Sequence, residues 1–125
     1  MLCIDTSSLV AYLEGAKGTD IHLVDQAFSD GVGSVSPVTV TEILSDPNLN
    51  RSLRELILKL PVLPIIDGFW ERAGIMRAKL IRSGHKAKMA DTLIAQNCMD
   101  HGAVLLTRDK DFKIFQRWTG LKVLP

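Results

Sequence analysis

The chain has 125 residues, of which 46% are hydrophobic and 23% charged, and its formal net charge is +1. A chain of this length forms one domain that buries about two-thirds of its surface, so its core needs no disulfides. The balanced charge gives no support to general nucleic-acid binding, which would have to rest on local basic clusters. The composition predicts a single domain over residues 1–125.

The two cysteines and the apolar runs bear on where the protein resides. Cys3 and Cys98 lie among apolar residues, which favours buried free thiols in a reducing cytoplasm over a disulfide. The longest apolar run, residues 60–66, is short and contains two prolines, so no membrane span is expected. Asp5 interrupts the apolar start of the chain before a secretory signal forms. We expect a cytoplasmic protein with no membrane partner.

Short apolar runs alternate with amphipathic ones, a pattern typical of α/β folds in which helices flank a short, mostly parallel central sheet. Strands are predicted at residues 1–4, 35–38, 62–66, 103–107 and 121–124. Helices are predicted at residues 6–14, 20–28, 39–45, 49–60, 68–83, 88–100 and 111–118. Two prolines restrict the 62–66 run to a sheet edge. Asp67 is expected to cap the helix that follows it.

Four acidic residues lie at the edges of these segments. Asp5 and Asp109 follow predicted strands, whereas Glu42 and Asp91 lie near the starts of predicted helices. The carboxyl ends of parallel strands meet at one edge of a sheet, where such folds bind ligands. Two unit charges ~4 Å apart repel by roughly 4 kcal/mol at an effective dielectric of about 20, so converging carboxylates need protons or a cation. A divalent cation is the simplest solution, and oxygen ligands suit Mg²⁺ or Mn²⁺.

Each acidic residue also has an ordinary structural explanation. Asp5 fits a helix N-cap, Glu42 fits a capping box, and Asp91 complements the positive end of a helix dipole. Asp109 and Asp111 fit a solvated turn after a buried strand. These roles do not exclude a shared site, because a carboxylate at a helix N-terminus is able to bind a metal as well.

Four motifs resemble those of a PIN domain. They are LCIDTSS at residues 2–8, TVTEI at 39–43, ADTLIA at 90–95 and LTRDKDF at 106–112. Their order and spacing match the family, and the resemblance covers nearly the whole chain. Within the family, the chain is most similar to the VapC-type ribonuclease toxins of prokaryotic toxin–antitoxin pairs. Each motif alone is unspecific, whereas the four in order are specific.

The resemblance implies a PIN-like α/β domain with an acidic cleft at the carboxyl edge of its strands, and a Mg²⁺- or Mn²⁺-dependent ribonuclease. The catalytic carboxylates and metal ligands would be Asp5, Glu42, Asp91 and Asp109, with Asp111 as a further metal ligand or an auxiliary acid. Many such toxins carry an amide in place of Asp109 and keep the acid at 111, so the division of labour between the two stays open. Supporting hydroxyls would come from Thr6, Ser7 and Thr107.

The expected chemistry follows from charge. A phosphodiester resists attack because the nucleophile and its target are both rich in electrons. Bound cations lower the pKa of a water molecule and stabilise the charge that grows on the phosphate and the leaving oxygen. The carboxylates hold the cation and accept the proton. The sequence contains no Ser-His-Asp order, zinc-type cysteine pattern or phosphate-binding glycine motif that would indicate another mechanism.

Local positive charge is expected to hold the RNA. Residues 77–88 carry five basic side chains and no acid, and they lead directly to Asp91. This stretch fits a rim that contacts phosphates, or alternatively a solvated helix face. The predicted RNA contacts are Arg82, Lys86, Lys88, Arg108 and Lys110. Trp70 and Trp118 are more typical of packing, in the core or against a partner, than of base stacking.

The resemblance also implies a homodimer and a cognate antitoxin that covers the cleft. Two other functions stay open. One is a receiver-like phosphoacceptor domain with Asp67 as acceptor, although the first strand ends in one acid rather than a pair, and the run before Asp67 is a poor central strand. The other is a catalytically inactive PIN-like binding module, against which the intact acidic set argues.

Overall fold

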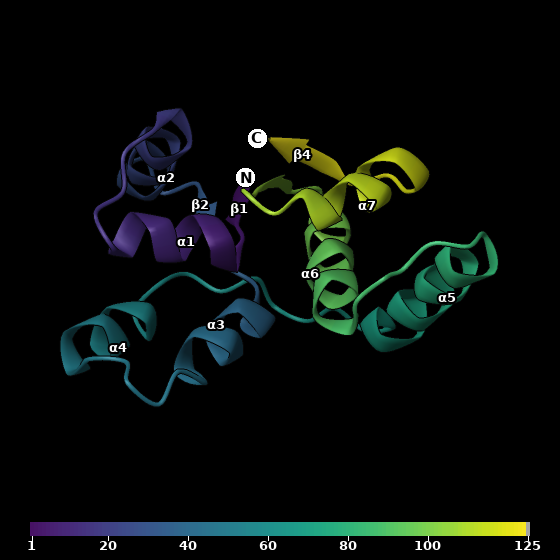
Figure 1. Ribbon diagram of the computed structural model, residues 1–125, viewed down its shortest axis with the longest axis horizontal. Coiled ribbons are helices and arrows are strands. Elements are labelled where there is room, and N and C mark those ends of the chain that lie inside the picture. Colours follow the sequence, from purple (N-terminus) through teal and green to yellow (C-terminus); the bar gives the residue numbers. More distant parts are fainter. Residues whose placement is uncertain (125) are drawn as a thin grey trace.

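The computed structural model describes residues 1–124, in which helices surround a four-stranded parallel sheet (Figure 1). The strands are β1 (Leu2–Ile4), β2 (Gly33–Ser34), β3 (Val104–Leu106) and β4 (Lys122–Leu124), in the order β2-β1-β3-β4. In the centre of the sheet, Cys3 pairs with Ser34 on one side and with Leu105 on the other. This register brings the carboxyl end of β1 beside that of β3, and the Asp5 N–H donates to the Leu106 carbonyl at 2.9 Å.

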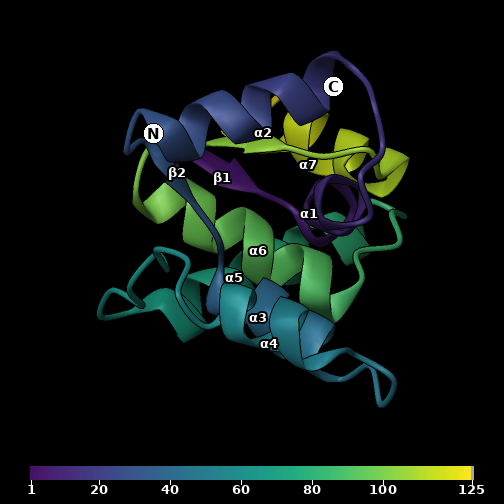
Figure 2. The ribbon, with the colours of Figure 1, turned by 90° about the vertical axis from the view of Figure 1, so that its left-hand side faces the viewer.

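Helices cover both faces of the sheet. They are α1 (Thr6–Leu13), α2 (Thr19–Ser29), α3 (Pro37–Leu44), α4 (Arg51–Ile57), α5 (Phe69–Arg82), α6 (Met89–Asp100), the 3₁₀ helix η1 (Lys110–Phe112) and α7 (Lys113–Trp118). The α2 helix lies over one face and α6 lies under the other (Figure 2). The α5 helix packs against α6. Within residues 1–124, no helix combines the length and hydropathy needed to span a bilayer.

The apolar core is divided between the two faces, because successive residues of a strand point to opposite sides. Cys3 and Leu105 belong to the cluster that α6 covers, whereas Ile4 and Leu106 belong to the cluster under α1 and α2. All four side chains are fully buried. Burying a leucine or isoleucine side chain contributes about 1.5–3 kcal/mol, so the short central strands are fixed by packing on both sides. Cys3 and Cys98 are buried free thiols, as predicted.

The second strand and the following helix both begin earlier than predicted. The strand is Gly33–Ser34 rather than 35–38, and the helix starts at Pro37 rather than Thr39. The Ser36 hydroxyl accepts from the Val38 N–H at 3.2 Å, and Pro37 occupies the first helical turn. A serine N-cap followed by proline is a strong helix start, and here it outweighs the β-branched residues that favour a strand.

The segment before α5 also differs from the prediction. Among the described residues, the 62–66 run makes a single bridge, between Val35 and Val62, and no strand. Asp67 does not cap α5, because Gly68 occupies the N-cap position with φ at +85° and no side-chain bond closes that end. A glycine reaches this left-handed backbone without steric cost, which moves the helix start one residue past the predicted cap.

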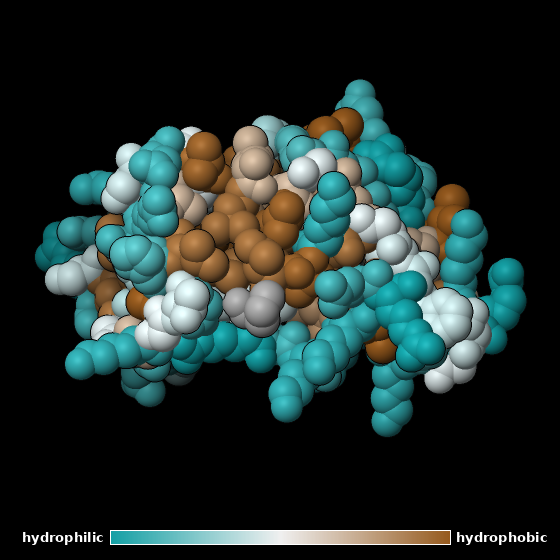
Figure 3. All heavy atoms as spheres, turned by 90° about the horizontal axis from the view of Figure 1, so that it is seen from above, coloured by the Kyte–Doolittle hydropathy of each residue, from teal (hydrophilic) through white to brown (hydrophobic). Residues whose placement is uncertain are grey.

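One face of the molecule retains exposed apolar surface. Figure 3 shows apolar side chains gathered in the middle of the face on which Figure 1 places α2, β4 and the N-terminus, with hydrophilic residues at its rim. Met1, which precedes β1, and Leu124, the last residue of β4, are 64% and 38% exposed. Apolar side chains are therefore exposed on this side of the molecule.

Candidate metal centre

Three acidic side chains meet where the start of α6 faces the turn between β3 and η1. Asp91, Asp109 and Asp111 each offer a carboxylate oxygen, and these oxygens all lie within 4.8 Å of one another. Asp91 lies in the first turn of α6. Asp109 caps η1, accepting from the Asp111 N–H at 2.9 Å. Oxygens about 2.1 Å from one octahedral ion lie roughly 3.0 to 4.2 Å apart, so side-chain rotations would bring the three carboxylates to one ion.

The electrostatics of this cluster favour an added positive charge. The pKa of Asp91 is raised from its usual 3.8 to about 6, first by burial and then by the charges of Asp109 and Asp5. Lys88 opposes this rise without cancelling it. A carboxylate with a pKa this high is stabilised either by a proton or by a bound cation.

Asp5 lies beside the cluster at the end of β1, where its side chain is 3% exposed. Its Oδ2 accepts from the Thr107 hydroxyl at 2.7 Å and from the Ser7 hydroxyl at 2.9 Å. It also caps α1 by accepting from the Ser7 N–H at 3.4 Å. Within residues 1–124, every hydrogen bond to this carboxylate goes to Oδ2, which leaves Oδ1 for another ligand. The structure thus places two of the predicted supporting hydroxyls on Asp5.

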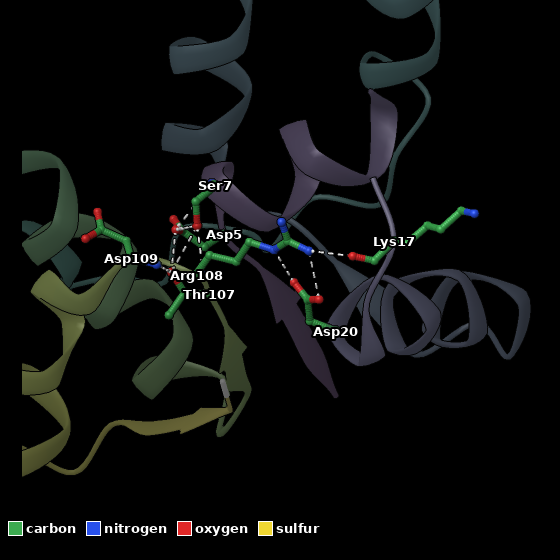
Figure 4. A network of polar contacts seen from close by, with 7 residues as sticks. All are labelled: Asp5, Ser7, Lys17, Asp20, Thr107, Arg108 and Asp109. Atoms are coloured by element: carbon green, nitrogen blue, oxygen red, sulfur yellow. Dashed lines mark hydrogen bonds and ion pairs between the residues drawn. The ribbon is translucent and has the colours of Figure 1, made fainter. Parts of the chain in front are cut away.

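The same two hydroxyls hold the turn that carries Asp109 (Figure 4). The Ser7 Oγ accepts from the Arg108 N–H at 3.0 Å, and the Thr107 Oγ1 accepts from the Asp109 N–H at 2.9 Å. Each hydroxyl donates to Asp5 and accepts from the turn, so the positions of the two acids are linked.

Glu42 lies outside the group of three acids. It is exposed on α3, and its Oε1 accepts from the Thr6 hydroxyl at 2.7 Å. The Thr6 oxygen also lies 3.2 Å from the Thr39 hydroxyl oxygen. Thr6 follows Asp5 directly, so Glu42 stands on the α3 side of the site. The third predicted supporting hydroxyl therefore contacts Glu42 rather than Asp5, and the cap of α3 is Ser36 rather than the predicted Thr39 box.

Two of the five predicted RNA contacts are engaged in ion pairs. Lys88 Nζ lies 2.7 Å from Asp111 Oδ2, and this hydrogen bond raises the pKa of the lysine. Arg108 pairs with Asp20 of α2, Nε to Oδ2 at 2.5 Å and Nη2 to Oδ1 at 3.0 Å. The side chains of the other three, Arg82, Lys86 and Lys110, are exposed.

Asp20 is a site neighbour that the sequence did not indicate. It lies 88 residues from Arg108 along the chain, and in the sequence it is an ordinary first-turn acid of a helix. Gly18 precedes it with φ at +148°, and a Cβ there would lie 2.7 Å from Asp20 Oδ1. A glycine two residues before an acid is the one local signal of this close approach.

Comparisons of the sequence and of the structure with known proteins point to the same family. The sequence matches the family described as PIN domain over residues 2–117. It is 34% identical over 131 residues to Ribonuclease VapC11 of Mycobacterium tuberculosis and to VapC ribonuclease Mb1587 of Mycobacterium bovis, covering 98% of this chain and 96% of each relative.

Solved structures share the fold. VapBC-1 from nontypeable Haemophilus influenzae has a TM-score of 0.75 at 22% identity, and covers 98% of this chain and 96% of its own. VapBC2 from Rickettsia felis, bound to a DNA fragment from their promoter, has a TM-score of 0.76 at 17% identity with the same coverage. Likeness at this level of identity concerns the fold alone.

Proposed function

The chain belongs to the PIN-domain family, and from this premise we propose that it is a Mg²⁺- or Mn²⁺-dependent endoribonuclease, the toxin of a toxin–antitoxin pair. The observation that carries the proposal is the convergence of Asp91, Asp109 and Asp111, with Asp5 close enough to raise the pKa of Asp91. Relatives at 34% identity over nearly the full chain are named ribonucleases.

The donor set fits a hard divalent cation. The three clustered ligands are carboxylates, and the group contains neither histidine nor cysteine. Oxygen-only sites of this kind suit Mg²⁺ and Mn²⁺ and give little preference to zinc. Asp91, Asp109 and Asp111 would hold the ion, with Oδ1 of Asp5 as a further ligand.

The side chains divide the remaining work. When bound, the cation lowers the pKa of a water molecule and offsets the charge that grows on the phosphate. Ser7 and Thr107 keep Asp5 in one orientation through its Oδ2. Glu42, held by Thr6 and outside the cluster, is the carboxylate least committed to the ion, and we assign to it the proton that the attacking water releases.

We propose that the RNA backbone follows two basic regions. Arg82 and Lys86 form an exposed rim at the end of α5 and in the connection to α6. The second region is a groove of about 460 Å³ beside Asp109, with Lys110 and Lys113 along it. Lys88, now paired with Asp111, would exchange that carboxylate for a phosphate when RNA binds.

Two apolar surfaces suit protein partners. A groove of about 180 Å³ beside Thr6 and Glu42 is lined by apolar side chains of α1, α3 and α4; we propose that a segment of a cognate antitoxin occupies it and covers the cleft. A second groove, of about 380 Å³ between α5 and α6, is bordered by Trp70, Ile81 and Met89, all exposed. Exposed apolar patches mark interfaces, and we assign this one to a homodimer in the cytoplasm.

The test is incubation of the purified protein with structured RNAs, with Mg²⁺ or Mn²⁺ and with a chelator, beside an Asp5→Asn variant. We expect cleavage that requires the metal, and a rate at least about 100-fold lower in the variant, because a loss of several kcal/mol of charge stabilisation has that effect. Equal cutting by both proteins, or cutting that survives chelation, would reject the mechanism.

The alternatives make different predictions. The receiver-like function requires Asp67 at the end of a central strand, and the structure has no strand there within the described residues. Phosphorylation of Asp67 by acetyl phosphate would nevertheless support the receiver-like function. An inactive binding module would show neither cleavage nor Mn²⁺ binding.

A further inference from the structure

The side chain of Arg108 points away from Asp109 and reaches Asp20 at the start of α2 (Figure 4). Its guanidinium makes a two-pronged ion pair with Asp20, and Nη2 also donates to the Lys17 carbonyl at 3.2 Å. The Asp20 side chain is only 12% exposed and that of Arg108 is 39% exposed. Arginine–carboxylate pairs with two parallel bonds are stronger and geometrically stricter than ordinary hydrogen bonds.

The connection between α1 and α2 passes close to this pair. A Cβ at Gly18 would lie 2.7 Å from Asp20 Oδ1 and 3.2 Å from Arg108 Nη2. A side chain at position 18 would therefore collide with the pair unless Asp20 and Arg108 moved, and glycine avoids this collision. The hydrogen bond from Arg108 also lowers the pKa of Asp20, which keeps the carboxylate ionised.

The turn that carries Asp109 has little support from the main chain. The N–H groups of Arg108 and Asp109 both donate to side-chain hydroxyls, those of Ser7 and Thr107. A backbone bond of 2.9 Å from the Asp5 N–H to the Leu106 carbonyl fixes the end of β3. Beyond it, the backbone bonds of the turn within residues 1–124, Thr107 N–H to the Leu124 carbonyl and Phe112 N–H to the Asp109 carbonyl, are long at 3.3 and 3.4 Å. The position of the turn therefore depends on side chains, and Arg108 anchors its outer side.

We propose that Arg108 is a positioning residue whose ion pair with Asp20 ties the β3–η1 turn to the start of α2. The tether holds the Asp109 carboxylate within reach of the other two acids of the cluster. Arg108 thus acts by positioning Asp109 and not by binding a phosphate. This role replaces the RNA contact that the sequence predicted for it. The inference rests on the proposed function, because its readout is the affinity of the cluster for a divalent cation.

The experiment measures Mn²⁺ binding by calorimetry in the wild-type protein and in Asp20→Asn and Arg108→Gln variants. Each variant is expected to bind Mn²⁺ about 10-fold more weakly, the lower end of the effect of partners that orient metal ligands. The kcat for RNA should fall with it, while KM changes less than about 2-fold. The double variant should be no weaker than either single one, because both changes remove the same pair.

Two controls separate positioning from general loss of structure. Arg51→Gln removes an exposed pair with Glu55 on α4 that involves none of the three clustered acids, and should leave Mn²⁺ binding unchanged. Arg108→Lys keeps the charge but loses the two-pronged geometry, so its Mn²⁺ affinity should lie between wild type and Arg108→Gln. Thermal melting of every variant shows whether it is folded.

The results also discriminate against a phosphate contact. If Arg108 bound RNA, Asp20→Asn would free it and tighten RNA retention in chelator, while Arg108→Gln would weaken retention, and neither would alter Mn²⁺ affinity. That pattern, or variants that bind Mn²⁺ like wild type, would overturn the tether and leave the nuclease intact. Absence of Mn²⁺ binding by the wild-type protein would instead reject the proposed function and the tether together.

Discussion

Asp91 carries the clearest electrostatic signature of the site. Its position in the first turn of α6 favours the anion by about 0.3–1 kcal/mol. Burial and the nearby charges of Asp109 and Asp5 act in the opposite direction and win, because the pKa rises to about 6. An acid placed where its charge is costly is common at functional sites, and here the cost falls on a predicted metal ligand.

This raised pKa predicts an unusual pH dependence. Between pH 3.8 and about 6, the folded state keeps a proton that the unfolded chain has lost. The contribution of Asp91 to stability therefore falls as the pH rises through this window and stays low above it. Mn²⁺ binds the ionised form, so its affinity should rise from pH 5 to pH 7 and then level off. Thermal melting at both pH values, with and without Mn²⁺, measures both effects.

The matched variant for this prediction is Asp91→Asn, which has no proton to lose. Its melting temperature should change less between pH 5 and 7 than that of the wild-type protein, and Mn²⁺ should stabilise it weakly. An identical pH profile in the two proteins would mean that another group titrates in this range.

The sequence predicts the acids of this site better than their partners. Asp91, Asp109 and Asp111 converge because short motifs fix their places at the starts of helices and the ends of strands. The partners come from pairings across the fold, since Lys88 and Asp111 are 23 residues apart and Arg108 and Asp20 are 88 apart. Local patterns carry no information on such pairs, so the sequence assigns both cations to RNA.

At the scale of elements, the connection from α5 to α6 brings the positively charged side chain of Lys88 to the acidic cluster. Lys88 is the N-cap of α6, and its ammonium lies 2.7 Å from Asp111 Oδ2. The lysine therefore neutralises a carboxylate that a divalent cation would otherwise bind. Lys88→Ala is expected to strengthen Mn²⁺ binding a few-fold, because Asp111 is freed, and to weaken RNA binding in chelator, because a phosphate contact is lost.

The matched control is Lys86→Ala, which removes the same charge two residues earlier from an exposed side chain. It should weaken RNA binding and lower its salt dependence, as expected for a phosphate contact, while Mn²⁺ affinity stays near that of wild type. Weaker Mn²⁺ binding by Lys88→Ala would show that the lysine supports the ion rather than competing with it.

Element boundaries show where local signals compete. The run from Val35 to Val40 is rich in β-branched residues and suggests a strand, but Ser36 and Pro37 start a helix inside it. The fold settles the competition, because β1 pairs with Gly33 and Ser34 and needs no longer partner. The boundary also decides where Glu42 stands, on α3 opposite Thr6. The sequence was sufficient to predict a parallel α/β sheet, but it was not sufficient to predict the order of the strands.

At the scale of the molecule, both tryptophans lie outside the core. Packing in the core was one sequence expectation for Trp70 and Trp118, yet they are 62% and 55% exposed. Core positions on α5 are instead taken by Phe69, Ala73 and Leu80. Because the tryptophans are exposed, contact with a partner is the sequence expectation that remains for them. On α5, which carries Trp70, Ile75 and Ile81 are also at least half exposed, as is Met89 at the start of α6.

The homodimer proposal is tested on this surface. Trp70→Glu combined with Ile81→Glu should convert a dimer into a monomer of 13.8 kDa, measured by light scattering after gel filtration. Stable interfaces bury about 1,200–2,000 Å² and tolerate no unpaired charge at their centre. Leu58→Glu, at an exposed apolar residue beyond α4, adds one charge elsewhere and should leave the dimer intact.

Two outcomes contradict the assignment: a wild-type protein that is monomeric, or a double variant that remains a dimer. The second would move the interface to another apolar surface, such as the face beside α2 and β4 in Figure 3. The choice matters for the site, because α5 leads through residues 83–88 into the start of α6, and Asp91 lies in that first turn. A dimer built on α5 would hold the end of the basic rim and the first acid of the cluster in one rigid unit, whereas a dimer through the sheet edge would leave both free.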